Sequence, residues 1–174
     1  MTMIEGLLAE LEQEAHATRR VLERVPDQHL SWKPHPKSMS LGQLALHVAM
    51  VPGNVAELAA GSGLTEPPAF VHEPARTSAE LVPALDDSIA RARVALGSFD
   101  DAAMAATWRL TVAGKEVMAV PRAGLVRAVM LNHWYHHRGQ LLVYLRLLDV
   151  PVPSVYGPSA DENPFAASAE PVKP

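Results

Sequence analysis

Residues 2–25 read TMIEGLLAELEQEAHATRRVLERV, and this stretch decides the fold class. Its apolar and small residues recur at alternating spacings of four and three, which places them along one side of an α-helix. The stripe comprises Ile4, Leu8, Leu11, Ala15, Thr18, Leu22 and Val25. Thr2 and Glu5 form a capping-box pattern, in which two side chains satisfy free amides at a helix start. Pro26 cannot continue the helix, so the stretch is predicted to be one helix of a bundle.

A second helix is predicted to begin after Ser40. Ser40 and Gln43 repeat the capping-box pattern ahead of the run LGQLALHVAMV. Its inward stripe comprises Leu44, His47 and Val51. Pro52 removes the hydrogen bond that would reach the carbonyl of Val48, so we expect a kink or a break there before the chain continues as GNVAELAAG.

Glycine, proline and capping residues divide the middle of the chain into segments. GSGLTEPPAFVHEPAR is rich in glycine and proline and is expected to form a long connection. Thr77 and Glu80 form a third capping box before the helical run ALDDSIARARVALGSF, with Pro83 delaying its first regular turn. TWRLTV and KEVMAV are short alternating runs on either side of AGK, and they predict a small β-hairpin. Pro121 suits the first turn of a final helix that reaches about Leu148.

Together these segments predict an all-α fold. The expected architecture is a four-helix bundle with a long connection and a small β-hairpin before the last helix. The chain has 174 residues, which suits a single domain spanning residues 1–174, with a flexible tail from about residue 164. Metal and cofactor sites in bundles are built from side chains that face the central axis, so polar residues on inward stripes are the candidates for function.

Composition excludes several classes of function. The chain contains no cysteine, so any bound metal must be held by His, Asp or Glu, and a cysteine nucleophile is excluded. The net charge is -4 and the basic residues are scattered, so nucleic acid is not an expected partner. No apolar run is long enough to span a membrane, and the acidic N-terminus is unlike a secretory signal, so the expected location is the cytoplasm. Serine hydrolase, P-loop and dinucleotide-binding motifs are absent from the sequence.

Three histidines lie close together in LNHWYHHRGQL, residues 131–141. At about 100° per residue, His133 and His137 share a helix face with Val129. His136 lies about 60° from His133 and is still partly inward. Side chains four apart can both reach one ion, as in HExxH proteases, but the glutamate of that motif is missing here. The spacing alone leaves open whether His133 pairs with His137 or with His136.

Two interpretations of the inward histidines remain open. His47 lies in the middle of its own stripe, so three imidazoles from two helices could converge on zinc, nickel or a similar ion. Alternatively, each histidine is a core residue bonded to its own carbonyl or carboxylate, in a bundle without metal. The histidines in polar or loop contexts are expected at the surface: His16, His29, His35 and His72.

The chain resembles the DinB-like family of four-helix metalloproteins. The resemblance rests on ATRRVLERVP and LSWKPHPKSMSLGQLALHV near the start, and on NHWYHHRGQLLVYLRLLDVPVPSVYGPSADE near the end. In the family, one histidine of the second helix and an HxxxH pair of the last helix bind a divalent metal ion. The resemblance therefore implies His47, His133 and His137 as the metal ligands, and it favours His137 over His136.

The resemblance also implies a range of functions. The family is similar to thiol-dependent S-transferases that use bacillithiol, mycothiol or glutathione. We therefore expect a metal-dependent transferase or hydrolase that acts on a small molecule, with a low-molecular-weight thiol as a partner. Family members are often dimers, which implies a homodimer. The alternative is a non-catalytic metal-binding stress-response bundle that forms a dimer.

Five further polar residues near the motif have expected roles that follow from their positions. Gln140 and Tyr144 share the face of the HxxxH pair, so they are expected to bond a ligand atom or a histidine nitrogen, or to line a partly wet core. Arg138 points about 140° away from His133 and is expected to form a salt bridge to another element or to lie in an interface. Asp161 and Glu162 are expected to stabilise a capped helical turn, with direct ligation of the metal or orientation of a histidine as the alternatives.

Overall fold

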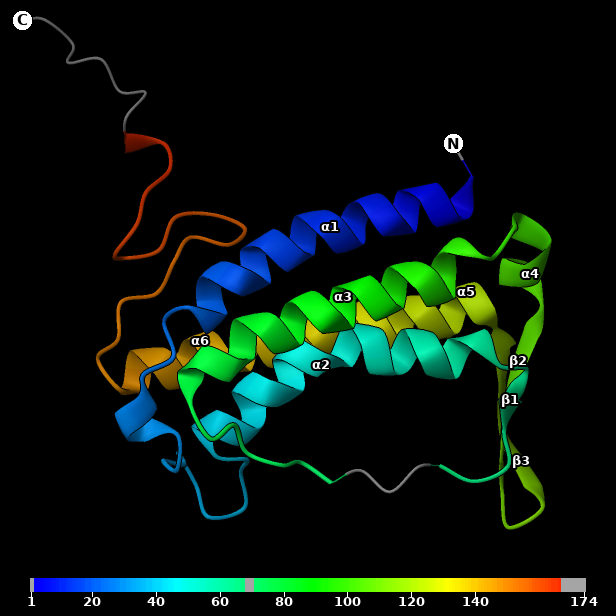
Figure 1. The fold of residues 1–174 in the computed structure, drawn as a ribbon, viewed down its shortest axis with the longest axis horizontal. Coiled ribbons are helices and arrows are strands. Elements are labelled where there is room, and N and C mark those ends of the chain that lie inside the picture. Colours follow the sequence, from blue (N-terminus) through cyan, green and yellow to red (C-terminus); the bar gives the residue numbers. More distant parts are fainter. Residues whose placement is uncertain (1, 68–70, 167–174) are drawn as a thin grey trace, which may run out of the picture.

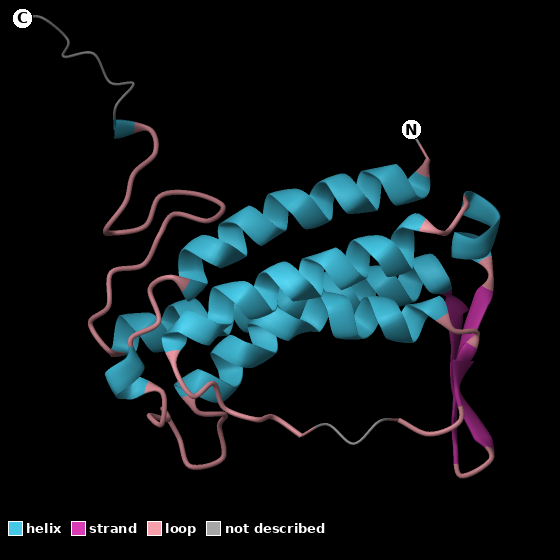
Figure 2. Ribbon diagram, in the orientation of Figure 1, coloured by secondary structure: helices cyan, strands magenta, loops and turns pink. Residues whose placement is uncertain are grey.

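The computed structural model describes residues 2–67 and 71–166. Its long helices pack side by side into a bundle (Figures 1 and 2), which confirms the predicted fold. They are α1 (Met3–Leu22), α2 (Leu41–Ala60), α3 (Leu81–Gly97) and a composite last segment of α5 (Arg122–Leu125), the π-helical η3 (Val126–Asn132) and α6 (His133–Leu147). Within the described ranges, no helix combines the length and apolar character needed to cross a membrane.

A small sheet covers one end of the bundle (Figure 1). Strands β2 (Thr107–Val112) and β3 (Lys115–Pro121) pair antiparallel, which confirms the predicted hairpin. The connection after α2 adds a third strand that was not predicted, β1 (Gly63–Leu64), parallel to β2. Gly63 has φ +154°, and a Cβ at this position would lie 2.3 Å from the carbonyl oxygen of Arg109. Only glycine therefore lets β1 approach β2 so closely.

The helix starts follow the predicted capping in two cases out of three. Both side-chain to backbone bonds of the capping box are present at α1 and at α2. The third box is wrong, because the side chain of Thr77 makes no capping bond and Glu80 accepts from the amide of Arg76 at 3.2 Å. A 3₁₀ turn begins there, and its tighter winding changes which residues face each other. The short helical elements are η1 (Asp27–His29), η2 (Ser78–Glu80) and α4 (Asp101–Ala105).

Of the kink or break expected at Pro52, the break does not occur, because helix α2 continues through the proline. The carbonyl of Val48, which loses its helical donor to the proline, accepts a hydrogen bond from the indole of Trp134 in α6 at 2.8 Å. The amide of Gly53 donates to the hydroxyl of Ser88 in α3, also at 2.8 Å. Neighbouring helices therefore satisfy the backbone around the proline, and these bonds join α2 to both of them.

A buried ion pair joins α1 to α6. The guanidinium of Arg138 lies 2.6 Å from the carboxylate of Glu14, and these side chains are 2% and 8% exposed. Arg138 also donates to the hydroxyl of Thr18 at 3.1 Å, and the hydroxyl of Tyr156 donates to Glu14 at 2.8 Å. The salt bridge expected for Arg138 is confirmed, but it lies inside the bundle. The buried face of α1 accordingly differs from the predicted stripe and comprises Ile4, Leu7, Leu11, Glu14, Thr18, Val21 and Leu22.

Two carboxylates hold the segment after α6 against the bundle. Asp161 pairs with Arg146 of α6 and accepts from the amide of Val152 at 2.8 Å. Glu162 pairs with Arg20 of α1, at 2.6 Å for one carboxylate oxygen. Their role is structural, but these bonds attach the segment to arginines of α6 and α1 instead of capping a helical turn. The tail that was expected to be flexible from about residue 164 lies mostly outside the described residues, which end at 166.

Candidate metal centre

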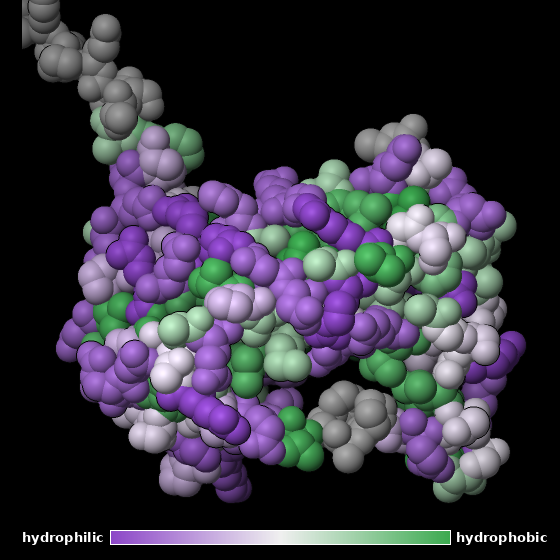
Figure 3. Space-filling model, viewed as in Figure 1, coloured by the Kyte–Doolittle hydropathy of each residue, from purple (hydrophilic) through white to green (hydrophobic). Residues whose placement is uncertain are grey.

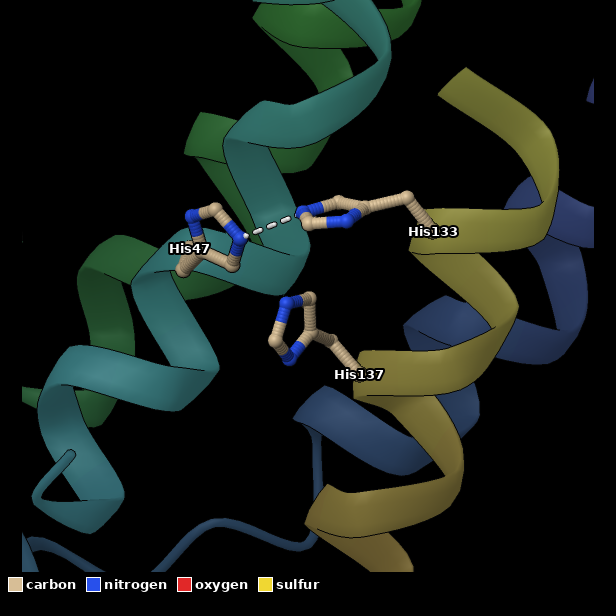
Figure 4. Close-up of side chains that lie close together, drawn as sticks. All are labelled: His47, His133 and His137. Carbon is tan, nitrogen blue, oxygen red and sulfur yellow. Dashed lines mark hydrogen bonds between the residues drawn. The ribbon is translucent and has the colours of Figure 1, made fainter. Parts of the chain in front are cut away.

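His47, His133 and His137 converge between α2 and α6 (Figure 4). His47 projects from the first half of α2, while His133 and His137 lie one turn apart at the start of α6. The Nε2 atoms of His47 and His133 are 3.1 Å apart. One nitrogen from each of the three rings lies within 4.8 Å of the other two. The structure therefore brings together the three residues that the resemblance implied as ligands.

This set of donors fits a divalent metal ion. Two nitrogens bound to one zinc ion at about 2.05 Å in tetrahedral geometry stand about 3.3 Å apart. The separation of 3.1 Å between the nitrogens of His47 and His133 is close to that value. The nitrogen of the remaining ring lies within 4.8 Å of both, so the three donors share one ion after a shift of up to about 1.5 Å. Three imidazoles without a thiolate suit zinc, nickel or a similar ion, and they leave coordination positions for a ligand.

The environment keeps these imidazoles neutral. Burial, followed by the neighbouring rings of His137, His72 and His133, lowers the pKa of His47 from 6.5 to about 3. Burial is also the largest cause of the lowered pKa of His133 and of His137, although the hydrogen bond with Gln140 acts in the opposite direction at His137. A neutral imidazole has the free lone pair that binds a metal ion. At pH 7 the site therefore presents unprotonated donors.

Only one of the two polar residues predicted beside the histidines contacts them. The side-chain oxygen of Gln140 lies 2.8 Å from Nδ1 of His137. Because that oxygen accepts, the bond places the proton on Nδ1 and leaves the lone pair of Nε2 free. Tyr144 instead donates to the carbonyl of Met39 at 3.4 Å, and its ring meets that of Trp32 edge-on at 5.6 Å. Gln140 orients a candidate ligand, whereas Tyr144 holds the loop before α2.

The histidines lie at the margin of the core, not at its centre as predicted. The buried stripe of α6 is shifted by one residue and comprises Trp134, Arg138, Leu141 and Leu145. The π-helical η3 explains the shift, because a π turn holds one residue more than an α turn. In an unbroken α-helix, the residue two turns after the buried Val126 and on the same face would be His133. Because η3 holds one extra residue, Trp134 takes that buried place. His133 and His137 are thereby turned toward the edge of the bundle.

A cavity of about 730 Å³ opens onto the histidine nitrogens. Its volume lies within the range of small-molecule sites. The apolar residues that line it are Met39, Val51, Val55, Leu58, Val71 and Val129. In Figure 3 the surface is hollowed beside α2. Coordination positions that the protein leaves open would therefore face a space suited to a small molecule.

His72 was expected at the surface, and the structure corrects that prediction. It is half-buried, it lines the cavity, and its ring meets that of His47 edge-on with centroids 4.8 Å apart. Its carbonyl accepts from the side chain of Gln43 at 2.8 Å, which attaches the long connection to the start of α2. No sequence signal marked His72, because a proline-rich connection has no periodicity from which to infer a direction. His136 is exposed and lies outside the converging group, so the geometry agrees with the choice of His137.

The model of the DinB family matches residues 1–166. The chain belongs to the DinB family. The protein YrdA of Bacillus subtilis (strain 168) is 26% identical over an alignment of 166 residues that covers 91% of this chain and 91% of YrdA.

Solved structures show the same DinB-like fold. A DinB-like protein from Bacillus cereus ATCC 10987 superposes with a TM-score of 0.69 at 21% identity, covering 89% of this chain and 98% of that one. The DinB-like protein YjoA from Bacillus subtilis gives a TM-score of 0.64 at 17% identity, covering 86% and 97%. The resemblance inferred from the sequence is thereby confirmed for the family and the fold.

Proposed function

We propose that this DinB-family protein is a divalent-metal-dependent enzyme that transfers a low-molecular-weight thiol to an electrophilic small molecule. The observation that carries the proposal is the cavity that ends at the three imidazole nitrogens. Structural metal sites are closed by a fourth protein ligand, whereas catalytic sites keep a position for water or substrate. In the described part of the chain the converging group contains three histidines, and a space for a ligand adjoins it.

The residues of the site have distinct roles in this reaction. A bound zinc or nickel ion would supply the Lewis acid that favours a thiolate over a thiol. His47, His133 and His137 supply neutral donors, and Gln140 fixes the proton of His137 on Nδ1. The apolar walls hold the electrophile and exclude water that would compete with the thiol. A sulfur–carbon bond forms as the bond from carbon to the leaving group breaks, and the thiol proton is released with that group.

Metal binding is tested by elemental analysis of protein reconstituted with zinc or nickel and then passed through a desalting column. We expect about one ion per chain in the wild type. The double variant His133→Ala, His137→Ala should lose the ion, whereas His136→Ala should keep it. His136 is the matched control because it is exposed and adjacent to His137 but outside the converging group. Equal metal content in the wild type and the double variant would disprove the metal centre.

Thiol transfer is tested separately with a chlorobimane electrophile, a set of small thiols and the metal-loaded protein. We expect product formation above the uncatalysed rate, and loss of that excess in the double variant. A protein that binds the ion but neither binds nor transfers a thiol would be the non-catalytic metal-binding bundle instead. The homodimer implied by the resemblance is part of the same proposal, and light scattering of the purified protein measures it.

A further inference from the structure

The wall of the histidine cavity has an uneven distribution of charge. Beyond the histidines, most of its lining is aliphatic. Two polar side chains of α2, Asn54 and Glu57, also line it. Among the lining residues that the structure describes, Glu57 carries the only formal charge at pH 7, and no lysine or arginine takes part.

The cavity is also elongated along α2. Its lining includes both His47 and Leu58, which are eleven positions apart on this helix. At a rise of 1.5 Å per residue, these positions are separated by about 16 Å along the helix axis. Glu57 lies next to Leu58, so the carboxylate is at the end of the cavity far from the imidazoles. A ligand held at the histidines can therefore reach Glu57 only if it is extended.

The charge at this far end is negative even when its neighbours are counted. Arg91 of α3 donates to Glu57 and to Asp87, both at 2.8 Å, and to Asn54 at 3.2 Å. One guanidinium is thus shared between two carboxylates, and its donors are directed at groups of its own cluster. The side chains of Arg91 and Glu57 are 28% and 52% exposed, so the excess negative charge acts on a nearby ligand through a partly aqueous medium.

From this arrangement we propose that the cavity binds an extended thiol whose far end is cationic, in preference to a neutral one, and discriminates against an anionic one. This inference rests on the proposed function, because it assumes that the sulfur is held at the histidine site. The aliphatic middle of the cavity accepts a hydrocarbon chain. At the far end Glu57 attracts an ammonium group, accepts a hydrogen bond from a hydroxyl and repels a carboxylate.

The test uses cobalt-loaded protein and three thiols of equal length: 8-aminooctane-1-thiol, 8-mercaptooctan-1-ol and 8-mercaptooctanoate. Binding of sulfur to cobalt is followed by the thiolate-to-metal absorption in the near ultraviolet. We expect the aminothiol to bind about tenfold more tightly than the carboxylate, with the alcohol between them. The difference in affinity between the aminothiol and the carboxylate should become smaller at high salt, because the charges are partly exposed.

Glu57→Gln provides the decisive comparison. It removes the charge of the side chain without changing its shape. The ratio of the affinity for the aminothiol to the affinity for the carboxylate should therefore fall toward one. Glu116→Gln is the matched control, since Glu116 is a similarly exposed partner of an arginine, on β3, and does not line the cavity. The control should keep the tenfold ratio.

The outcomes separate this inference from the proposed function. Equal affinities for the three thiols, or tightest binding of the carboxylate, would overturn the inference and leave thiol binding intact. An unchanged ratio in Glu57→Gln would overturn the assignment to that carboxylate. If cobalt is bound but none of the thiols alters its spectrum, the proposed function itself fails.

Discussion

The hydrogen bond from Trp134 to the carbonyl of Val48 should couple energetically to Pro52. Replacing Trp134 by Phe removes the donor and leaves a buried carbonyl without a partner, which costs about 1–3 kcal/mol. The smaller ring also leaves a cavity in the core, because Trp134 is fully buried, and this adds a second cost. In a Pro52→Ala background, residue 52 regains an amide that can donate to Val48. The hydrogen-bond cost should then disappear, and only the cavity cost should remain.

The measurement is a double-mutant cycle on the metal-free protein, with urea denaturation followed by circular dichroism. We expect Trp134→Phe to cost about 1–2 kcal/mol less in the Pro52→Ala background than in the wild type. Thermal midpoints should show the same difference, at about 2–4 °C for each kcal/mol in a chain of this size. If the two backgrounds give costs that agree within about 0.5 kcal/mol, Trp134 does not compensate for the proline.

Three further predictions follow from the buried groups. Glu14→Ala should lower the free energy of unfolding by about 3–5 kcal/mol, because it leaves Arg138 buried and unpaired. Glu12→Ala breaks an exposed pair with Arg93 and should lower it by less than about 1 kcal/mol. Similar urea midpoints for the two variants would refute this. The free energy of unfolding of the metal-free protein should fall as the pH falls from 6.5 toward 3, because His47 takes up a proton in the unfolded chain but resists it in the folded one. In urea titrations at several pH values, His47→Gln should reduce this pH dependence of stability. An unchanged pH dependence would contradict the prediction. His72→Ala should still bind one metal ion per chain. Its affinity for the ion, measured by competition with a chelator, should be within about tenfold of the wild type. Loss of the ion would show that His72 is a ligand.

The features that the sequence predicted well are set by local interactions. The capping boxes at Ser40 and Thr2 act over three residues, and the hairpin between TWRLTV and KEVMAV has its glycine turn between the strands. Helix periodicity likewise locates α1 and α2 without knowledge of their neighbours. The pairing of His133 with His137 needed the family resemblance, because spacing alone could not reject His136.

The features that were missed depend on partners distant in the chain. Glu14 is buried only because Arg138 meets it across the bundle, and a periodicity based on apolar residues scores both as surface. Helix α2 continues through Pro52 because two other helices satisfy its backbone there: Trp134 donates to the carbonyl of Val48, and Ser88 accepts from the amide of Gly53. His72 reaches the site because the side chain of Gln43, in the first turn of α2, donates a hydrogen bond to its carbonyl. These are tertiary interactions, and no local pattern encodes them.

The π-helical η3 sets the rotational phase of the helix that carries the HxxxH pair. If Val126–Asn132 became a regular α-helix with all its residues kept, everything after it would rotate by about 100°. The imidazoles of His133 and His137 would then occupy the places of an indole and a guanidinium, opposite Val48 and Glu14. Deleting one residue from this segment would instead let it close as an α-helix with both imidazoles still at the cavity, so relatives that are one residue shorter between β3 and the HxxxH pair should have a regular helix there.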